Sequence, residues 1–219
     1  MIRDRFMTHS ALPTNLPRDP MPMFQEWVEA ARTGQVQRNP DAMVLATCTP
    51  SGLPSARVIL CKKLIADPGY IVFFTNYASR KGEQLEANAE AAAVFHWDAL
   101  GRQVRLEGAV TRSPEAESDE YFASRPLDSR IGAWASLQSQ PLDSRRTLLA
   151  RAASEAARFG ARVPRPPHWG GYRLWPRAVE LWNEGAFRVH DRARWTREIE
   201  PAGENVFSTG PWQATRLYP

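Results

Sequence analysis

Long apolar runs, metal-ligand clusters and nucleotide-binding loops are all missing from this sequence. No hydrophobic stretch approaches the ~20 residues of a membrane-spanning helix, and the N-terminal segment lacks the apolar centre of a secretory signal. We therefore expect a cytoplasmic protein that does not enter the membrane. The glycines form no Walker or dinucleotide-binding loop, and no spacing of His, Cys and carboxylate residues is typical of a metal site. Any chemistry must rest on other residues.

Cysteine and runs of like charge are also scarce. Cys48 and Cys61 each lie in an apolar, strand-like segment, where the usual role is a small buried thiol in a reducing compartment. The formal net charge of +4 and the pI near 9.4 admit a nucleic-acid partner. However, no five like charges adjoin one another, so a solvated basic surface is the better interpretation and we expect no nucleic-acid partner.

Lysine is the rarest cation in the chain. Of 28 Lys and Arg residues, only Lys62, Lys63 and Lys81 are lysines. Lysine offers a compact point charge and arginine a planar fork, so a mixture of the two around one spot suits a phosphate with several oxygens. The segments 57–62 and 79–85 combine the two residue types and therefore predict a first anion site.

A predicted helix over residues 79–88 supports this first site. Ser79 is its candidate N-cap, and Arg80 and Lys81 lie in its first turn. Cations at a helix N-terminus oppose the helix dipole. An anion bound at the free N–H groups would supply a reason for them.

A second anion site is predicted from Tyr121, Arg125 and Ser129. Tyr121 and Arg125 are four residues apart, which on a helix places both on one face, and the Ser129 hydroxyl follows shortly after. A phenol, a guanidinium and a hydroxyl could converge there on one anion. The alternative for Arg125 is a helix-end cation that satisfies the last carbonyls of its helix. Two anion sites indicate two phosphorylated small molecules.

The pattern of elements predicts one domain over residues 23–219 after a flexible or partner-draped N-terminal arm, residues 1–22. Antiparallel strands interrupted by helices, without βαβ alternation, indicate an α+β barrel and disfavour a Rossmann fold. The expected helices cover residues from 23 to Gly34, 79–88, a segment ending near 125, and a segment from a cap at Asp143 to about 159, with a short apolar turn at 131–136. The expected strands cover 42–49, 55–64, 70–76, 91–97, 101–108, 171–182, 187–199 and 212–219.

The segments above take their place in a series of motifs along the chain. The main ones are Arg57 to Lys62, residues 73–76, Ser79 to Lys81, residues 102–105, Tyr121 to Ser129, Gln138-Ser139 and Arg188 to Arg192. In this order they resemble the pyridoxamine (pyridoxine) 5′-phosphate oxidase family, from about Leu16 to Pro219. The resemblance implies an FMN-binding split β-barrel of antiparallel strands with flanking helices, in a homodimer that holds two FMN molecules at its interface. It also implies oxidation of pyridoxamine or pyridoxine 5′-phosphate to pyridoxal 5′-phosphate, with O2 as acceptor and H2O2 as the second product.

The resemblance also implies which residues bind each molecule, some of them from the other subunit. The FMN phosphate and ribityl chain, and then the ring, would be contacted by Arg57, Val58, Ile59, Leu60, Cys61, Lys62, Phe74, Thr75, Arg80, Lys81, Gln103, Gln138, Ser139, Trp182 and Arg192. The substrate would be contacted by Lys62, Tyr121, Arg125, Ser129, Arg188, Val189 and His190. Arg188 and His190 would be the catalytic residues.

Strand parity bears on these assignments. Arg57 and Lys62 are five residues apart and would face opposite sides of an unbroken strand, so a bulge or backbone contacts are required. Arg188 and His190 are two apart on an expected strand and share one face, which Arg192 continues. His190 by itself would more often be a hydrogen-bonded strand residue, and the family motif is what favours a catalytic role.

The chain departs from the family pattern at three places. Cys61 replaces an aliphatic residue, Phe74 replaces a tyrosine, and Asn183-Glu184-Gly185 stands where the family usually has Gln-Gly. The first two changes should preserve binding, and the third bears on substrate preference. Two further readings stay open: a related split-barrel flavoenzyme of the phenazine type, and a non-catalytic carrier of FMN or pyridoxal phosphate.

Overall fold

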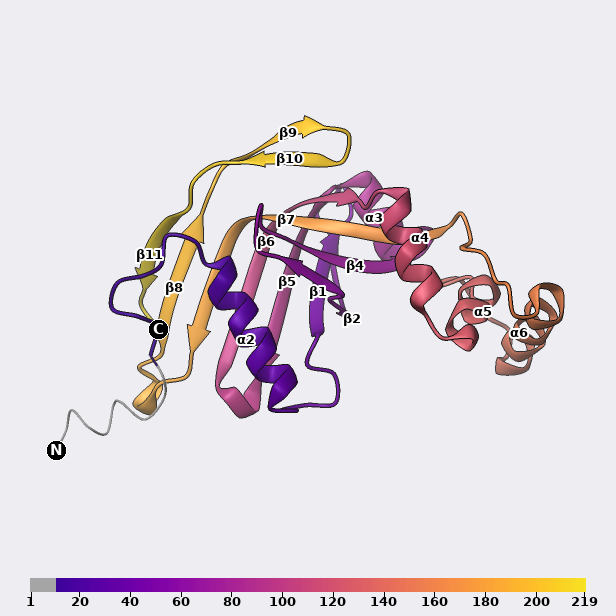
Figure 1. Cartoon of the computed structure of the whole chain (residues 1–219), viewed down its shortest axis with the longest axis horizontal. Helices are drawn as coiled ribbons and strands as arrows, with labels where there is room; N and C mark the ends of the chain where they lie inside the picture. Colours follow the sequence, from indigo (N-terminus) through magenta and orange to yellow (C-terminus); the bar gives the residue numbers. More distant parts are fainter. Residues whose placement is uncertain (1–10) are drawn as a thin grey trace.

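The computed structural model describes residues 11–219, and its main body is one strongly curled antiparallel sheet of nine strands (Figure 1). The hydrogen-bonded order is β11-β8-β7-β6-β5-β1-β2, while β4 pairs with both β7 and β3, and β9 and β10 form a separate hairpin. The strands are β1 (Ala42–Cys48), β2 (Pro54–Leu60), β3 (Lys63–Ile65), β4 (Tyr70–Asn76), β5 (Glu90–Trp97), β6 (Arg102–Arg112), β7 (Trp169–Asn183), β8 (Asp191–Thr196), β9 (Ile199–Gly203), β10 (Val206–Thr209) and β11 (Gln213–Leu217).

Five α-helices flank this sheet within the described residues. They are α2 (Met21–Thr33), α3 (Arg80–Ala87), α4 (Glu115–Ser124), α5 (Leu127–Ala135) and α6 (Arg145–Phe159), with short 3-10 turns η1 (Asp98–Leu100) and η2 (Ala186–Arg188). Helix α2 lies across one face of the sheet, whereas α4, α5 and α6 gather at one end of the molecule (Figure 1). The antiparallel α+β barrel expected from the sequence is confirmed in this arrangement.

The core lies between α2 and the curled sheet. Strand β5 alternates buried and more exposed residues, as a strand with one covered face must. Its Phe95 meets Phe24 of α2 edge to face, with ring centroids 5.1 Å apart. Phe24 lies on the expected helical face with Trp27 and Val28, and all three are buried. Each such large side chain contributes about 1.5–3 kcal/mol when it leaves water.

The first part of the predicted arm packs against the sheet. Leu12 is 5% exposed, and its N–H donates to Asp191 at 2.8 Å. The Pro17 carbonyl accepts from the Trp195 indole at 2.8 Å. Helix α2 begins at Met21, two residues before the expected start, where the Asp19 carboxylate accepts from the Met21 N–H. Residues 11–20 of the predicted arm therefore lie against the sheet and the start of α2, and residues 1–10 lie outside the described residues.

Two local expectations about helices were wrong. The segment expected to form a turn at 131–136 belongs mostly to α5. Helix α6 is capped by Ser144 instead of Asp143, because the Ser144 hydroxyl accepts from the Thr147 N–H at 3.1 Å.

The expected strand 55–64 is interrupted at Cys61 and Lys62. Strand β2 pairs with β1, whereas β3 pairs with β4, so the chain changes its partner strand at this point. The Cys61 N–H donates to the Asp41 carbonyl and the Lys62 N–H donates to the Val72 carbonyl. This break resolves the parity difficulty, because Arg57 and Lys62 no longer belong to one regular strand.

Candidate functional site

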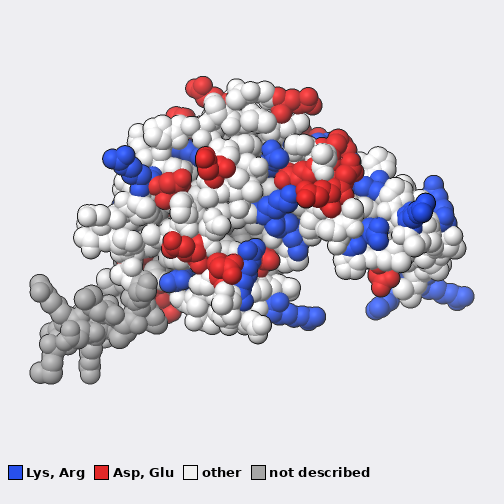
Figure 2. Space-filling model, viewed as in Figure 1, with Lys and Arg blue, Asp and Glu red and all other residues white. Residues whose placement is uncertain are grey.

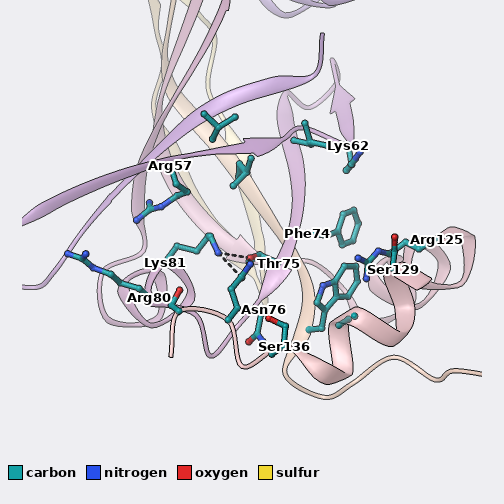
Figure 3. A pocket seen from close by; sticks show the side chains of 18 of the residues that line it. Arg57, Lys62, Phe74, Thr75, Asn76, Arg80, Lys81, Arg125, Ser129 and Ser136 are labelled. Atoms are coloured by element: carbon teal, nitrogen blue, oxygen red, sulfur yellow. Dashed lines mark hydrogen bonds between the residues drawn. The ribbon is translucent and has the colours of Figure 1, made fainter. Parts of the chain in front are cut away.

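A cavity of about 1040 Å³ lies between the β2 side of the sheet and helices α3, α4 and α5. It is lined by fourteen of the predicted site residues: Arg57, Val58, Ile59, Leu60, Lys62, Phe74, Thr75, Arg80, Lys81, Tyr121, Arg125, Ser129, Gln138 and Ser139. Both predicted anion sites therefore open into one cavity. In Figure 3, Arg57, Arg80 and Lys81 lie on one side of it and Arg125 and Ser129 on the other, with Phe74 between them.

Every charged side chain of residues 11–219 that lines the cavity is positive. Arg57, Lys62, Arg80, Lys81 and Arg125 line it, and no Asp or Glu of residues 11–219 does so. Within this described range none of the five forms a salt bridge. On the surface, in contrast, blue and red side chains adjoin one another over α4, where Arg165 pairs with Glu115 and Asp119 (Figure 2). An anionic ligand would supply the missing countercharge.

Lys81 is held by neutral groups alone. Its Nζ donates to Thr75 Oγ1 at 2.9 Å, to Ser79 Oγ at 3.0 Å and to Gln138 Oε1 at 2.9 Å. Ser79 also caps α3, as predicted, by accepting from the Gly82 N–H. Burial and, to a smaller extent, the nearby positive charge of Arg57 together lower the pKa of Lys81 to about 8.

Gly82 allows helix α3 to begin this close to β4. A Cβ atom at this position would lie 2.0 Å from the Tyr77 carbonyl oxygen, which no other residue could tolerate without moving the backbone. The glycine therefore fixes where the first turn of α3, and with it Lys81, meets the cavity.

Arg57 shows the same pattern on the same side of the cavity, where it projects from β2. Its guanidinium donates to the Leu45 carbonyl at 3.1 Å, to Thr47 Oγ1 at 2.7 Å and to Ser55 Oγ at 2.6 Å. Burial lowers the pKa of Arg57, and repulsion from Arg80 adds to the shift. The guanidinium is thus fixed in place, while its charge remains available to a ligand.

The second cation group is built on stacked aromatic rings. Phe74 stacks on Tyr121 with centroids 4.0 Å apart and on Trp169 with centroids 5.6 Å apart. The Arg125 guanidinium lies 4.6 Å from the centre of the Trp169 ring. Its Nη1 atom is buried without a hydrogen-bond partner in the described structure, and burial lowers its pKa. A buried donor without a partner indicates a ligand atom at this point.

Arg125 reaches the cavity by a route that the sequence did not predict. Helix α4 ends at Ser124, and Arg125 has an extended backbone with φ −73° and ψ 147°. Tyr121 and Arg125 therefore do not share a helical face, and Ser129 lies in the next helix, α5. All three nevertheless line the same cavity.

The remaining predicted site residues lie outside the cavity. Cys61 is buried in the core, where its thiol donates to the Lys63 carbonyl and burial raises its pKa to about 12. Gln103, Trp182 and Arg192 form a row across β6, β7 and β8, because Gln103 is registered with Trp182 and Trp182 with Arg192. We call this row, together with Arg188, Val189 and His190, the distal group.

Side chains and the chain end fix two members of the distal group. Arg192 donates from Nε and Nη2 to Glu180 Oε1 at 3.2 and 2.8 Å, and from Nη1 to the Tyr218 carbonyl at 3.0 Å. The His190 ring lies 4.7 Å from the Trp182 ring, and its Nδ1 accepts from the Gly185 N–H at 3.2 Å. In neutral His190 the ring proton is therefore on Nε2.

The strand expected over residues 187–199 forms only in part, as β8 and the first residue of β9. Phe187 and Arg188 adopt left-handed backbone conformations, with φ values of 56° and 63°, and β8 begins only at Asp191. Arg188 and His190 therefore do not share a strand face with Arg192. Non-glycine residues in this region are strained, and such strain often accompanies functional loops.

Sequence reasoning missed residues that support the cavity. Trp169 carries the stack beneath Arg125, and Gln84, buried on α3, contacts the residues that hold Arg57. Trp169 stands in the short segment His168-Trp169-Gly170-Gly171, and Gln84 follows Lys81 by three residues, which is about one helical turn. Among residues 11–219 no helix is long and apolar enough to cross a membrane, and this range contains no group of three potential metal ligands.

The fold and the cavity together define a split-barrel protein with a site for anionic small molecules. Residues 30–159 match the family model for pyridoxamine 5′-phosphate oxidase, and residues 169–219 match that for the pyridoxine 5′-phosphate oxidase C-terminal dimerisation region. The chain belongs to the pyridoxamine 5′-phosphate oxidase family, as the sequence motifs indicated.

Several proteins are similar over most of the chain. A pyridoxine/pyridoxamine 5′-phosphate oxidase of Rhodospirillum rubrum is 50% identical over 206 residues, which cover 92% of this chain and 97% of the relative. One of Cupriavidus necator is 46% identical over 218 residues, covering 100% and 97%. The crystal structure of PhzG from Burkholderia lata in complex with tetrahydrophenazine-1-carboxylic acid has a TM-score of 0.81 at 29% identity and covers 96% of this chain and 100% of its own.

The low pKa of Lys81 predicts how anion binding depends on pH. Sulfate keeps a constant charge near neutral pH, so only the protein titrates. Because protonated Lys81 is lost as the pH rises through about 8, the affinity for sulfate should fall by up to about tenfold between pH 7 and pH 9. Calorimetric titration of the flavin-free protein measures this. Lys81→Arg should remove the decline, and an unchanged decline in Lys81→Met would contradict the assignment.

Proposed function

We propose that this protein is an FMN-dependent oxidase that converts pyridoxamine or pyridoxine 5′-phosphate to pyridoxal 5′-phosphate, with O2 as acceptor and H2O2 as second product. The observation that carries this proposal is the cavity with cations at two ends and no carboxylate. The names and high identity of the relatives support it, since they are oxidases of these two vitamers.

The residues present fit FMN. Arg57, Arg80 and Lys81 gather on one side of the cavity beside the Thr75 hydroxyl, and they provide charge and hydrogen bonds for a phosphate monoester. Four charge-assisted hydrogen bonds would contribute roughly 8 kcal/mol, which is comparable with the cost of association itself. The apolar side chains Val58, Ile59 and Leu60 also line the cavity. They would bury part of the flavin ring and contribute the rest.

The second cation group fits the substrate phosphate. Arg125 offers a buried Nη1 without a partner, and Tyr121 and Ser129 add hydroxyls on the same side of the cavity. Lys62 lies at the break between β2 and β3 and also lines the cavity. These residues would orient the substrate so that its C4′ carbon faces the flavin ring. Bound FMN supplies the chemistry by accepting a hydride at N5.

The distal group completes the site from a second subunit in this proposal. Gln103, Trp182, Arg192 and residues 188–190 do not line the cavity of their own chain. Residues 169–219, which contain most of them, match the family's dimerisation region. A two-fold dimer would place one subunit's distal group over the other's cavity. There, Arg188 and His190 Nε2–H would hold the substrate, and Arg192 would face the flavin.

Two other functions compete with this one. The similarity to PhzG favours a split-barrel flavoenzyme that acts on a reduced phenazine ring. The substrate-phosphate group of Tyr121, Arg125 and Ser129 disfavours it, because a phenazine carboxylate has no phosphate. A non-catalytic FMN or pyridoxal phosphate carrier would have no need of Arg188 and His190.

One experiment tests the proposed reaction directly. The purified protein should be yellow, and its flavin absorbance should bleach when pyridoxine 5′-phosphate is added without oxygen, and return when air is admitted. Unphosphorylated pyridoxine provides the control for phosphate recognition. A yellow protein that bleaches with neither vitamer phosphate would contradict the oxidase and favour the carrier.

Arg125→Ala should weaken substrate binding and spare FMN. A lost hydrogen bond to a charged group costs about 1.5–3 kcal/mol, so KM for the phosphorylated vitamers should rise roughly ten- to hundredfold. Steady-state kinetics with measured flavin content checks this. Arg162→Ala, which removes an exposed arginine elsewhere, is the matched control. The assignment would be wrong if KM stayed at the wild-type value.

Mixed dimers should reveal a site shared between subunits. Arg125→Ala damages the cavity and His190→Ala the distal group, so each homodimer should have little activity at vitamer concentrations well below the KM of Arg125→Ala. After subunit exchange, each heterodimer holds one intact site, and the random mixture should recover about a quarter of wild-type activity. In the control mixture of Arg125→Ala with Lys62→Ala, each heterodimer has one substitution in each of its two cavities. Neither site is intact, so this mixture should recover no activity. Failure of the first mixture to recover activity would place both groups in one subunit.

A further inference from the structure

Gln84 is a buried amide behind the cavity wall. It is 5% exposed and lies on α3 one turn after Lys81, but it does not line the cavity. Its Oε1 atom accepts from Thr47 Oγ1 at 2.6 Å and from Ser55 Oγ at 2.7 Å, and Arg57 Nη2 lies 3.5 Å away. Gln84 thus joins α3 to the residues of β1 and β2 that hold Arg57.

The hydrogen bonds run in one direction, from Arg57 to Gln84. Arg57 donates to the hydroxyl oxygens of Thr47 and Ser55. Each of these hydroxyls then donates its own proton to Gln84 Oε1. An amide turned the other way would leave both hydroxyl protons without an acceptor. The network therefore requires an oxygen at this point.

A carboxylate could supply that oxygen as well as the amide does. Glutamate has the same shape as glutamine, and its oxygen would accept the same hydrogen bonds more strongly because of its charge. The Gln84 Nε2 atom is buried without a partner in the described structure, which is unfavourable for folding. Pairing with the Arg57 guanidinium would offset the cost of burying the carboxylate, so stability alone gives no reason for an amide at this position.

What the amide avoids is a negative charge beside Arg57. Every acceptor of the Arg57 guanidinium, namely the Leu45 carbonyl, two hydroxyls and the Gln84 amide, is neutral. A carboxylate here would pair with Arg57 and reduce the attraction of the cavity for an anion.

We propose that Gln84 is a positioning residue that fixes Arg57 through neutral acceptors and so leaves the guanidinium charge to a phosphate monoester. The inference rests on the proposed function, in which that group is the FMN phosphate. Gln84 does not touch the ligand and acts through Arg57.

The isosteric variant Gln84→Glu tests this inference in the full-length, flavin-free protein. Its affinity for FMN, measured by quenching of flavin fluorescence, should fall roughly ten- to hundredfold, which is the effect of weakening one hydrogen bond to a charged group. Its affinity for riboflavin, which lacks the phosphate, should not change. Its melting temperature without flavin should equal or exceed that of the wild type. Gln25→Glu adds the same charge at an exposed position of α2 and should change none of these.

Each other outcome has a definite meaning. Wild-type FMN affinity in Gln84→Glu would overturn the inference. Equal losses of FMN and riboflavin affinity with a lower melting temperature would also overturn it, because they show a structural role. If the wild type binds no FMN, the proposed function fails, and inorganic phosphate then decides the inference: weaker phosphate binding by Gln84→Glu upholds it, and equal or absent binding overturns it.

Discussion

Positive charge without a protein countercharge is the constraint on which this site depends. Arg57, Lys81 and Arg125 lose hydration in the cavity, and burial lowers the pKa of each. Such groups oppose folding, so the apolar core between α2 and the sheet must offset them. The protein holds Arg57 and Lys81 with hydroxyls, carbonyls and amides in place of carboxylates. This preserves their attraction for anions, whereas Arg165 and Arg173 are paired with acids of α4.

The geometry of the sheet creates the place for this charge. Pairing with β1 ends at Leu60, and pairing with β4 begins at Lys63. Lys62 therefore lies at the point where the chain changes its partner strand. Helix α3 follows β4 closely because Gly82 packs against the Tyr77 carbonyl. Cations from β2 and α3 therefore face one cavity, and the Phe74–Tyr121–Trp169 stack separates them from Arg125. One cavity thus contains two groups of cations with aromatic rings between them.

The distal group shows why one chain is not enough in the proposed mechanism. Two of its members are held by hydrogen bonds, Arg192 by Glu180 and the Tyr218 carbonyl and His190 by the Gly185 N–H. They stand apart from the cavity that they would serve. Formation of the dimer would then place donors that are already fixed in each subunit over the ligands. Because these side chains are fixed beforehand, less conformational entropy would be lost on ligand binding.

The sequence by itself determined the family, the residue types of the site and the regular parts of the fold. Local patterns can be recognised in a sequence before the fold is known. Examples here are the clustered lysines, the ordered motifs and the apolar stripe of α2, formed by Phe24, Trp27 and Val28. Only the tertiary structure decided the break at Cys61–Lys62, the exit of Arg125 from its helix, the bent chain before β8 and the role of Gln84. The physical reason is that these features depend on hydrogen bonds and packing between residues far apart in the chain. Gln84, for example, meets Thr47 across 37 positions.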